Sequence, residues 1–155
     1  MGDAQRREGE DPTALMERTD EREMLPLCRA EGIGVIPWSP LGRGVLARPG
    51  NRDPGERTER AKTDTQIDSL YAKTADQDAL VIEAVRKVAA RHDKPMAQIA
   101  YGWVASRPGV TSPIVGISKL AQFDDALAAL EIKLSDDDVA ELEAPYRPKP
   151  PSGHV

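Results

Sequence analysis

Cysteine and aromatic residues are scarce in this 155-residue sequence. The one cysteine, Cys28, excludes a disulfide within the chain and a cysteine-rich zinc site. Aromatic residues make up only 4% of the chain, which argues against a surface that stacks nucleic-acid bases. No run approaches the roughly 18 uninterrupted apolar residues that a transmembrane helix needs. The first fifteen residues are too charged for a signal peptide.

An excess of positive charge is absent as well. The chain has 26 acidic and 21 basic side chains, a net charge of −5, and an isoelectric point of about 5.1, which argues against binding to a phosphate backbone. Hydrophobic residues make up 39%, so most of the chain should fold as one domain. We expect a cytoplasmic protein without nucleic-acid or membrane partners. The chain is shorter than the roughly 200 residues that a closed eight-stranded β/α barrel needs.

Residues 1–18 have the pattern of a disordered tail, because few are apolar and their charges form no helical stripe. A helix should follow, since Asp20 and Glu23 have capping-box spacing and Gly32 is a natural helix end. Pro26 should weaken or kink this helix. The apolar stripe of the helix consists of Met24, Leu25, Leu27 and Cys28.

Two short apolar runs, residues 33–40 and 110–117, predict buried parallel strands. The first run follows a helix after a short turn, as in β/α alternation. Two strands do not make an independent sheet of ordinary size, so an incomplete structure is expected. Between the runs, about thirty residues at 47–76 have almost no apolar side chains, which is typical of a lid, a binding loop or disorder.

Four helices are predicted in the second half of the chain. Residues 76–94 have apolar side chains at helical spacing, and Pro95 opens the next helix from its first turn. Ser118 should cap the third helix and Ser135 the last, acidic one. The third helix should turn inward an apolar face of Phe123, Ala126, Leu127 and Leu130. The folded part is expected at residues 19–147, followed by an extended, proline-rich tail at 148–155.

Each predicted strand ends in a turn suited to an anion. After the first strand, two glycines would let backbone N–H groups approach a phosphate, and Ser39 or Arg43 could hydrogen-bond its oxygens. After the second, Ser118 begins a helix whose N-terminus is free, with Lys119 nearby. Taken alone, the first turn could equally be an ordinary loop after a strand, and the second an ordinary capped helix start. Together they match the phosphate-binding corner after strands 7 and 8 of a β/α barrel.

Three segments carry a family resemblance: residues 21–28, residues 34–44 with the block Trp-Ser-Pro-Leu-Gly-x-Gly, and residues 113–122 with the block Gly-x-Ser-x-x-x-Gln. They resemble the aldo-keto reductases, NADP(H)-dependent oxidoreductases built on a (β/α)8 barrel. The resemblance extends over roughly residues 15–155. It implies an α/β fold, the C-terminal part of a TIM barrel, with about two parallel strands and four to five helices.

The resemblance implies that NADP(H) binds at the two turns. Around the nicotinamide ribose and pyrophosphate it places Trp38, Ser39, Pro40, Leu41, Gly42 and Gly44, with Arg43 beside them. Around the adenosine end it places Gly116, Ser118, Gln122 and Asp125. Lys119 would pair with the 2′-phosphate, which favours NADP(H) over NAD(H). Ala126 stands where the family often has an amide, which puts one adenine contact in doubt. The loop at 47–76 stands where family members fold a belt over the cofactor.

The family's catalytic aspartate, tyrosine, lysine and histidine lie on its first four strands and have no counterpart in this sequence. Thr13-Ala14 stands where the family has a Tyr-Asn pair. We therefore expect this chain to be the C-terminal, cofactor-binding segment of a reductase that acts on small carbonyl compounds. The segment should be inactive alone, and whether the chain is an enzyme is left open. The alternative is a non-catalytic segment or interaction protein that associates with a partner supplying the remaining strands, or with itself through exposed barrel edges.

The other residues that could carry chemistry favour structural roles. His92 lies at a predicted helix C-terminus, where surface capping is expected, and the two histidines lack metal-ligand spacing. Cys28 and Trp103 lie on apolar helix faces and should be core residues. Tyr71 and Tyr101 have no lysine or histidine at a spacing that would make them proton donors.

Overall fold

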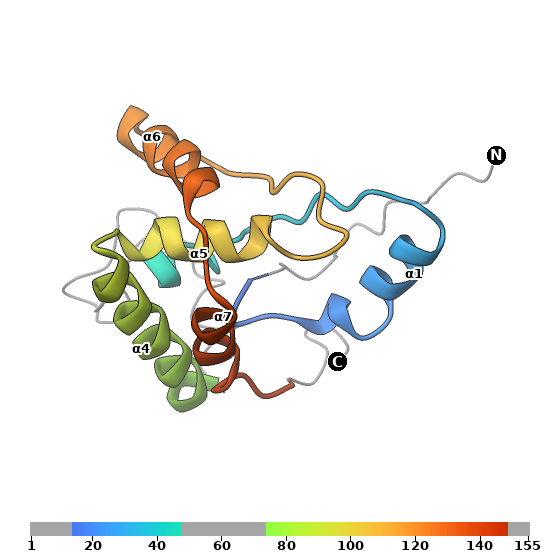
Figure 1. The fold of residues 1–155 in the computed structure, drawn as a ribbon, viewed down its shortest axis with the longest axis horizontal. Helices are drawn as coiled ribbons and strands as arrows, with labels where there is room; N and C mark the ends of the chain where they lie inside the picture. Colours follow the sequence, from blue (N-terminus) through green and yellow to red (C-terminus); the bar gives the residue numbers. More distant parts are fainter. Residues whose placement is uncertain (1–13, 48–73, 149–155) are drawn as a thin grey trace.

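Helices dominate the part of the chain that the structure describes. This computed structural model describes residues 14–47 and 74–148 (Figure 1). The α-helices are α1 (Met24–Ala30), α4 (Ala75–His92), α5 (Met96–Ala105), α6 (Leu120–Ala128) and α7 (Asp136–Glu143). Short 3-10 helices are η1 (Thr19–Glu21), η2 (Val45–Ala47) and η4 (Ala129–Glu131). Most of the predicted loop at 47–76, Tyr71 included, and nearly all of the predicted tail at 148–155 lie outside the described residues.

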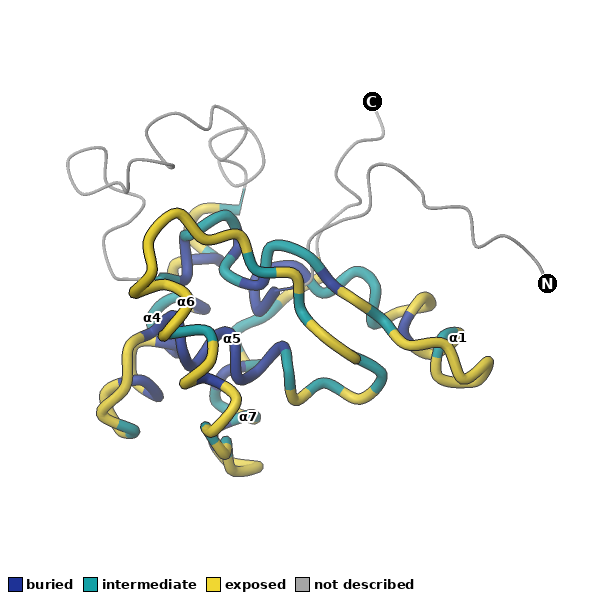
Figure 2. The backbone as a smooth tube through the Cα atoms, turned by 90° about the horizontal axis from the view of Figure 1, so that it is seen from above, coloured by how far each residue is buried: buried dark blue, intermediate teal, exposed yellow. Residues whose placement is uncertain are grey.

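The core lies where α4, α5 and α7 pack against one another (Figures 1 and 2). The apolar side chains of α4 recur at three- and four-residue spacing and turn inward, as predicted. Trp103 of α5 is fully buried, which confirms its predicted place in the core. The fully buried side chains of these helices include Val81, Val85, Val88, Ile99, Trp103, Val104 and Leu142.

Residues 14–17 also belong to the core. Ala14, Leu15 and Met16 have no exposed area, and they pack in the same cluster as Trp103. Ala14 and Glu17 exchange two backbone hydrogen bonds of 2.9 Å, which close a tight turn. The structure therefore differs from the prediction of a disordered tail through residue 18. So short an apolar run shows no periodicity, and packing against distant helices buries it.

Helix α1 begins later than its capping pattern predicts. Its N-cap residue is Glu23, which makes no side-chain capping hydrogen bond, so the predicted capping box with Asp20 is wrong. Because the helix begins at Met24, Pro26 falls in the first turn, where its missing N–H has no role, and the helix continues through it. The predicted weakening at Pro26 is therefore wrong. Gly32, with φ of +67°, ends the helix as predicted.

The two predicted strands lie side by side and run parallel. Isolated bridges join Val35 to Val110 and Trp38 to Ile114. The register shifts by one residue between the bridges, and Pro37 and Pro113 lack the N–H that a continuous ladder needs. Within the described ranges the parallel pairing is therefore present, but these segments do not form extended strands. The prediction that they are buried is wrong, because their isoleucines, Ile33, Ile36, Ile114 and Ile117, remain exposed.

Asp138 fastens α7 to the end of α4. Ser135 caps α7 as predicted: its Oγ accepts the Asp138 N–H at 3.1 Å, and the Asp138 carboxylate accepts the Ser135 N–H at 3.0 Å. The same carboxylate lies 2.9 Å from His92 Nε2 and accepts from Arg91 at 2.6 Å. Burial opposes ionisation of Asp138, but these hydrogen bonds outweigh burial and hold its pKa well below the ordinary value. His92 thus links two helices, beyond the surface capping that we expected.

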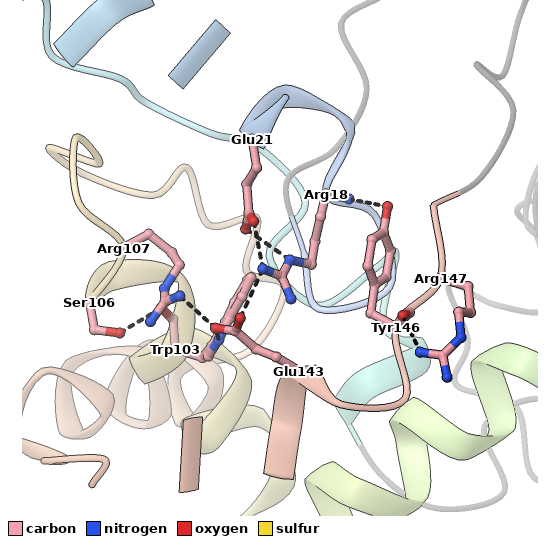
Figure 3. A network of polar contacts seen from close by, with 8 residues as sticks. All are labelled: Arg18, Glu21, Trp103, Ser106, Arg107, Glu143, Tyr146 and Arg147. Atoms are coloured by element: carbon pink, nitrogen blue, oxygen red, sulfur yellow. Dashed lines mark hydrogen bonds and ion pairs between the residues drawn. The ribbon is translucent and has the colours of Figure 1, made fainter. Parts of the chain in front are cut away.

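A second network ties the start of the described chain to α5 and α7 (Figure 3). Arg18 pairs with Glu21 through Nε at 2.9 Å and with Glu143 through Nη2 at 2.9 Å. Glu143 also accepts from Arg107 at 2.5 Å and from the Trp103 indole at 3.0 Å. Burial lowers the pKa of Arg18, but the carboxylates of Glu21 and Glu143 more than offset this, and the net shift is upward.

Many residues of α6 and α1 are exposed (Figure 2), and several of them are apolar. On α6, Leu120 is 76% exposed. The predicted inward face is wrong for Phe123 and Leu127 of α6 and for Leu130 of η4. Ala126 is half-buried. On and after α1 the exposed side chains are Met24, Leu27, Ile33 and Ile36, while Cys28 is half-buried rather than in the core. Of the described helices, none is long and apolar enough to cross a membrane.

Candidate cofactor-binding site

The first predicted turn, residues 39–44, has an unusual left-handed backbone. The φ angle is positive at Ser39 (58°), Gly42 (55°), Arg43 (57°) and Gly44 (92°). Glycine adopts such angles freely, whereas Ser39 and Arg43 hold them at a conformational cost. Strained residues of this kind gather at ligand-binding sites, so the loop is a candidate site on geometry as well as on sequence.

The loop's own carbonyls accept its glycine N–H groups. Gly42 donates to the Ser39 carbonyl at 2.8 Å, and Gly44 donates to the Leu41 carbonyl at 3.0 Å. The Arg43 N–H donates to Ser39 Oγ at 3.2 Å. The N–H groups of Gly42 and Gly44 are therefore already paired within the loop. The Ser39 hydroxyl accepts the Arg43 N–H and keeps its own proton to donate.

Trp38 and Arg43 form the charged and aromatic part of this loop. The guanidinium carbon of Arg43 lies 5.7 Å from the centroid of the Trp38 ring, within cation–π distance. Trp38 is half-buried and bridges to Ile114, and Pro40 is buried. The pairing holds a positive charge and an aromatic face at the carboxyl end of the first parallel segment.

The second predicted turn is closed by the side chain of Gln122. Its Oε1 accepts from the Ser118 N–H at 2.7 Å, the Ser118 hydroxyl at 3.2 Å and the Lys119 N–H at 3.1 Å. Lys119, rather than Ser118 as predicted, is the N-cap residue of α6. The donors that should meet an anion thus already face one acceptor oxygen, that of an amide. Gly116, Ser118 and Lys119 are exposed.

Asp125, one turn further along α6, is held from α5. Gln98 donates from Nε2 to Asp125 Oδ1 at 2.8 Å. Burial raises the pKa of the neighbouring Tyr101, and the negative charge of Asp125 raises it further. Sequence reasoning missed Gln98 and overlooked this environment of Tyr101. A polar residue between the buried Ala97 and Ile99 was the available signal for Gln98.

The fold brings both turns to one side of α5. Since the two segments run parallel and pair at Trp38 and Ile114, their carboxyl ends lie together. Leu41 of the first turn and Ala126 of α6 pack against one small cluster, which contains Ala97, Tyr101 and Ala129. Leu41 and α6 therefore pack on the same cluster, near the carboxyl ends of the paired segments, which is the edge where ligands of parallel β/α proteins bind.

A shallow cavity lies at the opposite end of the parallel segments. Its lining residues are Glu21, Leu25, Pro26, Arg29, Arg107 and Pro108, next to the starts of the two segments. In β/α barrels this end serves stability rather than chemistry. Residues 14–47 and 74–148 contain no group of histidine, cysteine and acidic side chains that could hold a metal ion.

Parallel segments that pair beside packed helices are typical of β/α proteins. The sequence model of the aldo/keto reductase family matches residues 12–147, and the chain belongs to this family. The relatives bear oxidoreductase names, and the family's fold is a TIM barrel.

Three relatives illustrate the similarity. The chain is 42% identical over 144 residues to a Schizosaccharomyces pombe protein assigned by name to the aryl-alcohol dehydrogenases, covering 91% of this chain and 38% of that protein. It is 39% identical over 136 residues to the versiconal hemiacetal acetate reductase of Aspergillus parasiticus, and the match covers 87% of this chain and 38% of that protein. It is 36% identical over 140 residues to the aldo-keto reductase AMT2 of Alternaria alternata, and the match covers 90% of this chain and 36% of that protein. The chain thus spans well under half the length of these relatives.

Proposed function

We propose that this chain is the cofactor-binding segment of an NADP(H)-dependent aldo-keto reductase. The observation that carries the proposal is that Leu41 of the first turn and Ala126 of α6 pack against one cluster on α5, while the segments that lead to the two turns pair at Trp38 and Ile114. A dinucleotide needs donors for two phosphate groups and a face for a flat ring, and these two turns offer both. A cytoplasmic location stays a prediction.

The side chains present fit such a ligand. In the first turn the Ser39 hydroxyl lies against the Arg43 backbone N–H and the Arg43 guanidinium lies over the Trp38 ring, and we expect a pyrophosphate to bind there. At the second turn, three donors already converge on the Gln122 amide oxygen, and a phosphate oxygen could accept in its place. The exposed ammonium of Lys119 would then pair with the 2′-phosphate, which favours NADP(H) over NAD(H). When bound, the nicotinamide supplies a hydride for carbonyl reduction.

Carbonyl reduction itself needs groups that this sequence does not match. The family's proton-donating tyrosine and its lysine, aspartate and histidine have no counterpart at matching positions. Tyr101 is buried, with 7% of its surface exposed. Among the described residues, no lysine or histidine makes a hydrogen bond with it. We therefore expect cofactor binding without turnover of small aldehydes or ketones by this chain alone.

A fluorescence titration of the purified chain with NADPH and NADH tests the proposal. We expect NADPH to bind more tightly, and Lys119→Ala to weaken NADPH binding about tenfold, as loss of a charged phosphate contact does, while NADH binding stays unchanged. Lys87→Ala on the exposed face of α4 is the matched control. Absence of NADPH binding by the unsubstituted chain would overturn the proposal, and rapid NADPH oxidation with an aldehyde panel would overturn the expected inactivity.

The exposed apolar side chains support a second candidate: association with a partner that supplies further strands, or with another copy of the chain. Leu120 and Leu130 are 76% and 65% exposed, and Ile36 and Ile114 remain exposed beside the paired segments. Light scattering distinguishes the candidates. NADPH binding supports the cofactor segment whether or not the chain associates, whereas association without NADPH binding supports the interaction role.

A further inference from the structure

Gln98 combines deep burial with an unsatisfied amide oxygen. The residue is 8% exposed, and its Oε1 has no hydrogen-bond partner in the structure. A buried acceptor without a donor costs free energy, so an apolar side chain of similar size would suit the packing of α5 better. What Gln98 contributes is therefore its Nε2 hydrogen bond to Asp125.

The orientation of this amide follows from its neighbour. Turning the amide over would place Oε1 against the Asp125 carboxylate, and two acceptors would then face each other. With Nε2 toward Asp125, the hydrogen bond of 2.8 Å joins a donor to a charged acceptor. The carboxylate on α6 is thus held by a donor from α5.

Asp125 uses only one of its two oxygens within the described structure. Oδ1 accepts from Gln98, whereas Oδ2 has no hydrogen bond to any described residue, and the side chain is half-buried. The residue lies one turn beyond Gln122, on the helix whose N-terminus forms the second turn. A half-buried carboxylate with one oxygen fixed and one unused is suited to accept a hydrogen bond from a ligand.

We propose that Gln98 is a positioning residue that holds Asp125 so that Oδ2 accepts from a donor group on the adenosine half of the dinucleotide. The inference rests on the proposed function, because it assigns one end of the ligand to α6. Gln98 does not touch the ligand, since its own oxygen is sealed from solvent. Its effect must therefore pass through Asp125.

Titrations with NADPH, adenosine 2′,5′-bisphosphate and nicotinamide mononucleotide test this. We expect Gln98→Leu to weaken binding of the first two probes about fivefold, as loss of a hydrogen bond to a charged group does, and to leave the third unchanged. The melting temperature should stay near that of the unsubstituted chain, because the unsatisfied oxygen is removed with the donor. Gln98→Met is the second variant, and Gln77→Leu, whose amide donates to the Arg147 carbonyl, is the matched control.

A double-mutant cycle decides whether Gln98 acts through Asp125. We expect the double variant Gln98→Leu with Asp125→Ala to bind adenosine 2′,5′-bisphosphate no more weakly than Asp125→Ala alone. Additive losses, unchanged binding in Gln98→Leu, or a loss of binding that only follows a fall in melting temperature would overturn the inference. If the unsubstituted chain does not bind NADPH, the proposed function fails and this inference fails with it. If the chain binds NADPH but Gln98→Leu does not weaken binding, only this inference fails.

Discussion

The buried indole of Trp103 donates to Glu143 at 3.0 Å, and the carboxylate oxygen that accepts it also accepts from Arg107. The second oxygen of Glu143 pairs with Arg18 at 2.9 Å (Figure 3). One carboxylate therefore joins three segments that lie far apart in the sequence. Residues 14–18 are held against α5 and α7 by this contact as well as by apolar packing.

Replacing Glu143 by alanine should destabilise the fold. The Arg18 and Arg107 side chains are only 13% and 17% exposed, so the substitution leaves two partly buried guanidinium groups and an indole N–H without this acceptor. We expect a loss of about 2–4 kcal/mol in the free energy of unfolding, measured by urea denaturation. Glu83→Ala, which removes the exposed ion pair with Arg86, is the control and should cause no measurable loss. Equal losses in the two variants would contradict the prediction.

Asp138 should make the stability of the fold depend on pH. Its pKa is lower in the folded chain than in the unfolded chain, so its contribution is fully present above the ordinary aspartate pKa of about 4. That contribution is lost as the pH falls from about 4 toward the lower folded pKa. Asp138→Asn should cost about 1–3 kcal/mol at pH 7, because Ser135, His92 and Arg91 lose a charged acceptor.

Urea denaturation of the Asp138→Asn variant and the unsubstituted chain at pH 7, 5 and 3 measures this difference. The difference between the two stabilities should begin to narrow at pH 3, because the unfolded chain then binds a proton that the folded Asp138 still excludes. Asp137→Asn is the matched control, because Asp137 lies in the same first turn but is exposed. A difference that stays constant with pH would show that the charge of Asp138 is not what holds α7 to α4.

Gly34 allows the parallel segments to approach each other. A Cβ atom at this position would lie 2.2 Å from Oγ1 of Thr111 and 3.3 Å from its Cβ. Gly34→Ala should therefore destabilise the chain by about 1–2 kcal/mol, as overpacking does. In the Thr111→Ala background the clash with Oγ1 is removed, and most of this loss should disappear. A double-mutant cycle of melting temperatures checks the prediction, and additive effects would refute it.

The exposed face of α6 should make the chain associate in solution. Phe123 and Leu127 are 44% and 49% exposed, so Phe123→Glu with Leu127→Glu replaces apolar contact area by charge without opening a cavity. We expect lower light scattering at equal protein concentration and unchanged far-ultraviolet circular dichroism. Leu80→Glu, on the exposed side of α4, is the matched control and should leave scattering unchanged. If both substitutions act equally, association does not depend on α6.

Local patterns predicted the elements whose stability is local. The helical spacing in α4, the stop at Gly32 and the Ser135 cap of α7 depend on hydrogen bonds and side chains within a few residues, and the structure has them where the sequence places them. The apolar runs bounded by glycine and proline predicted the parallel pairing of residues 33–40 with 110–117, although two prolines reduce that pairing to bridges.

Contacts between distant segments decided the rest. The burial of Leu15 and Met16 depends on a cluster that Trp103 and Leu142 complete, and no periodicity within residues 14–16 shows it. The apolar spacing of α6 predicted an inward face, but nothing described packs over Leu127, so spacing alone could not determine burial.

For the candidate site too, the sequence determined some features and the tertiary structure determined others. The sequence by itself determined the family and the two turns, because their glycine, serine and basic residues stand in short motifs. Only the tertiary structure showed that Gly42 and Gly44 use their N–H groups within the loop, that Gln122 closes the α6 N-terminus, and that Gln98 reaches Asp125 across 27 positions of sequence. The reason is physical: a motif specifies which donors and acceptors are present, whereas packing specifies which of them meet.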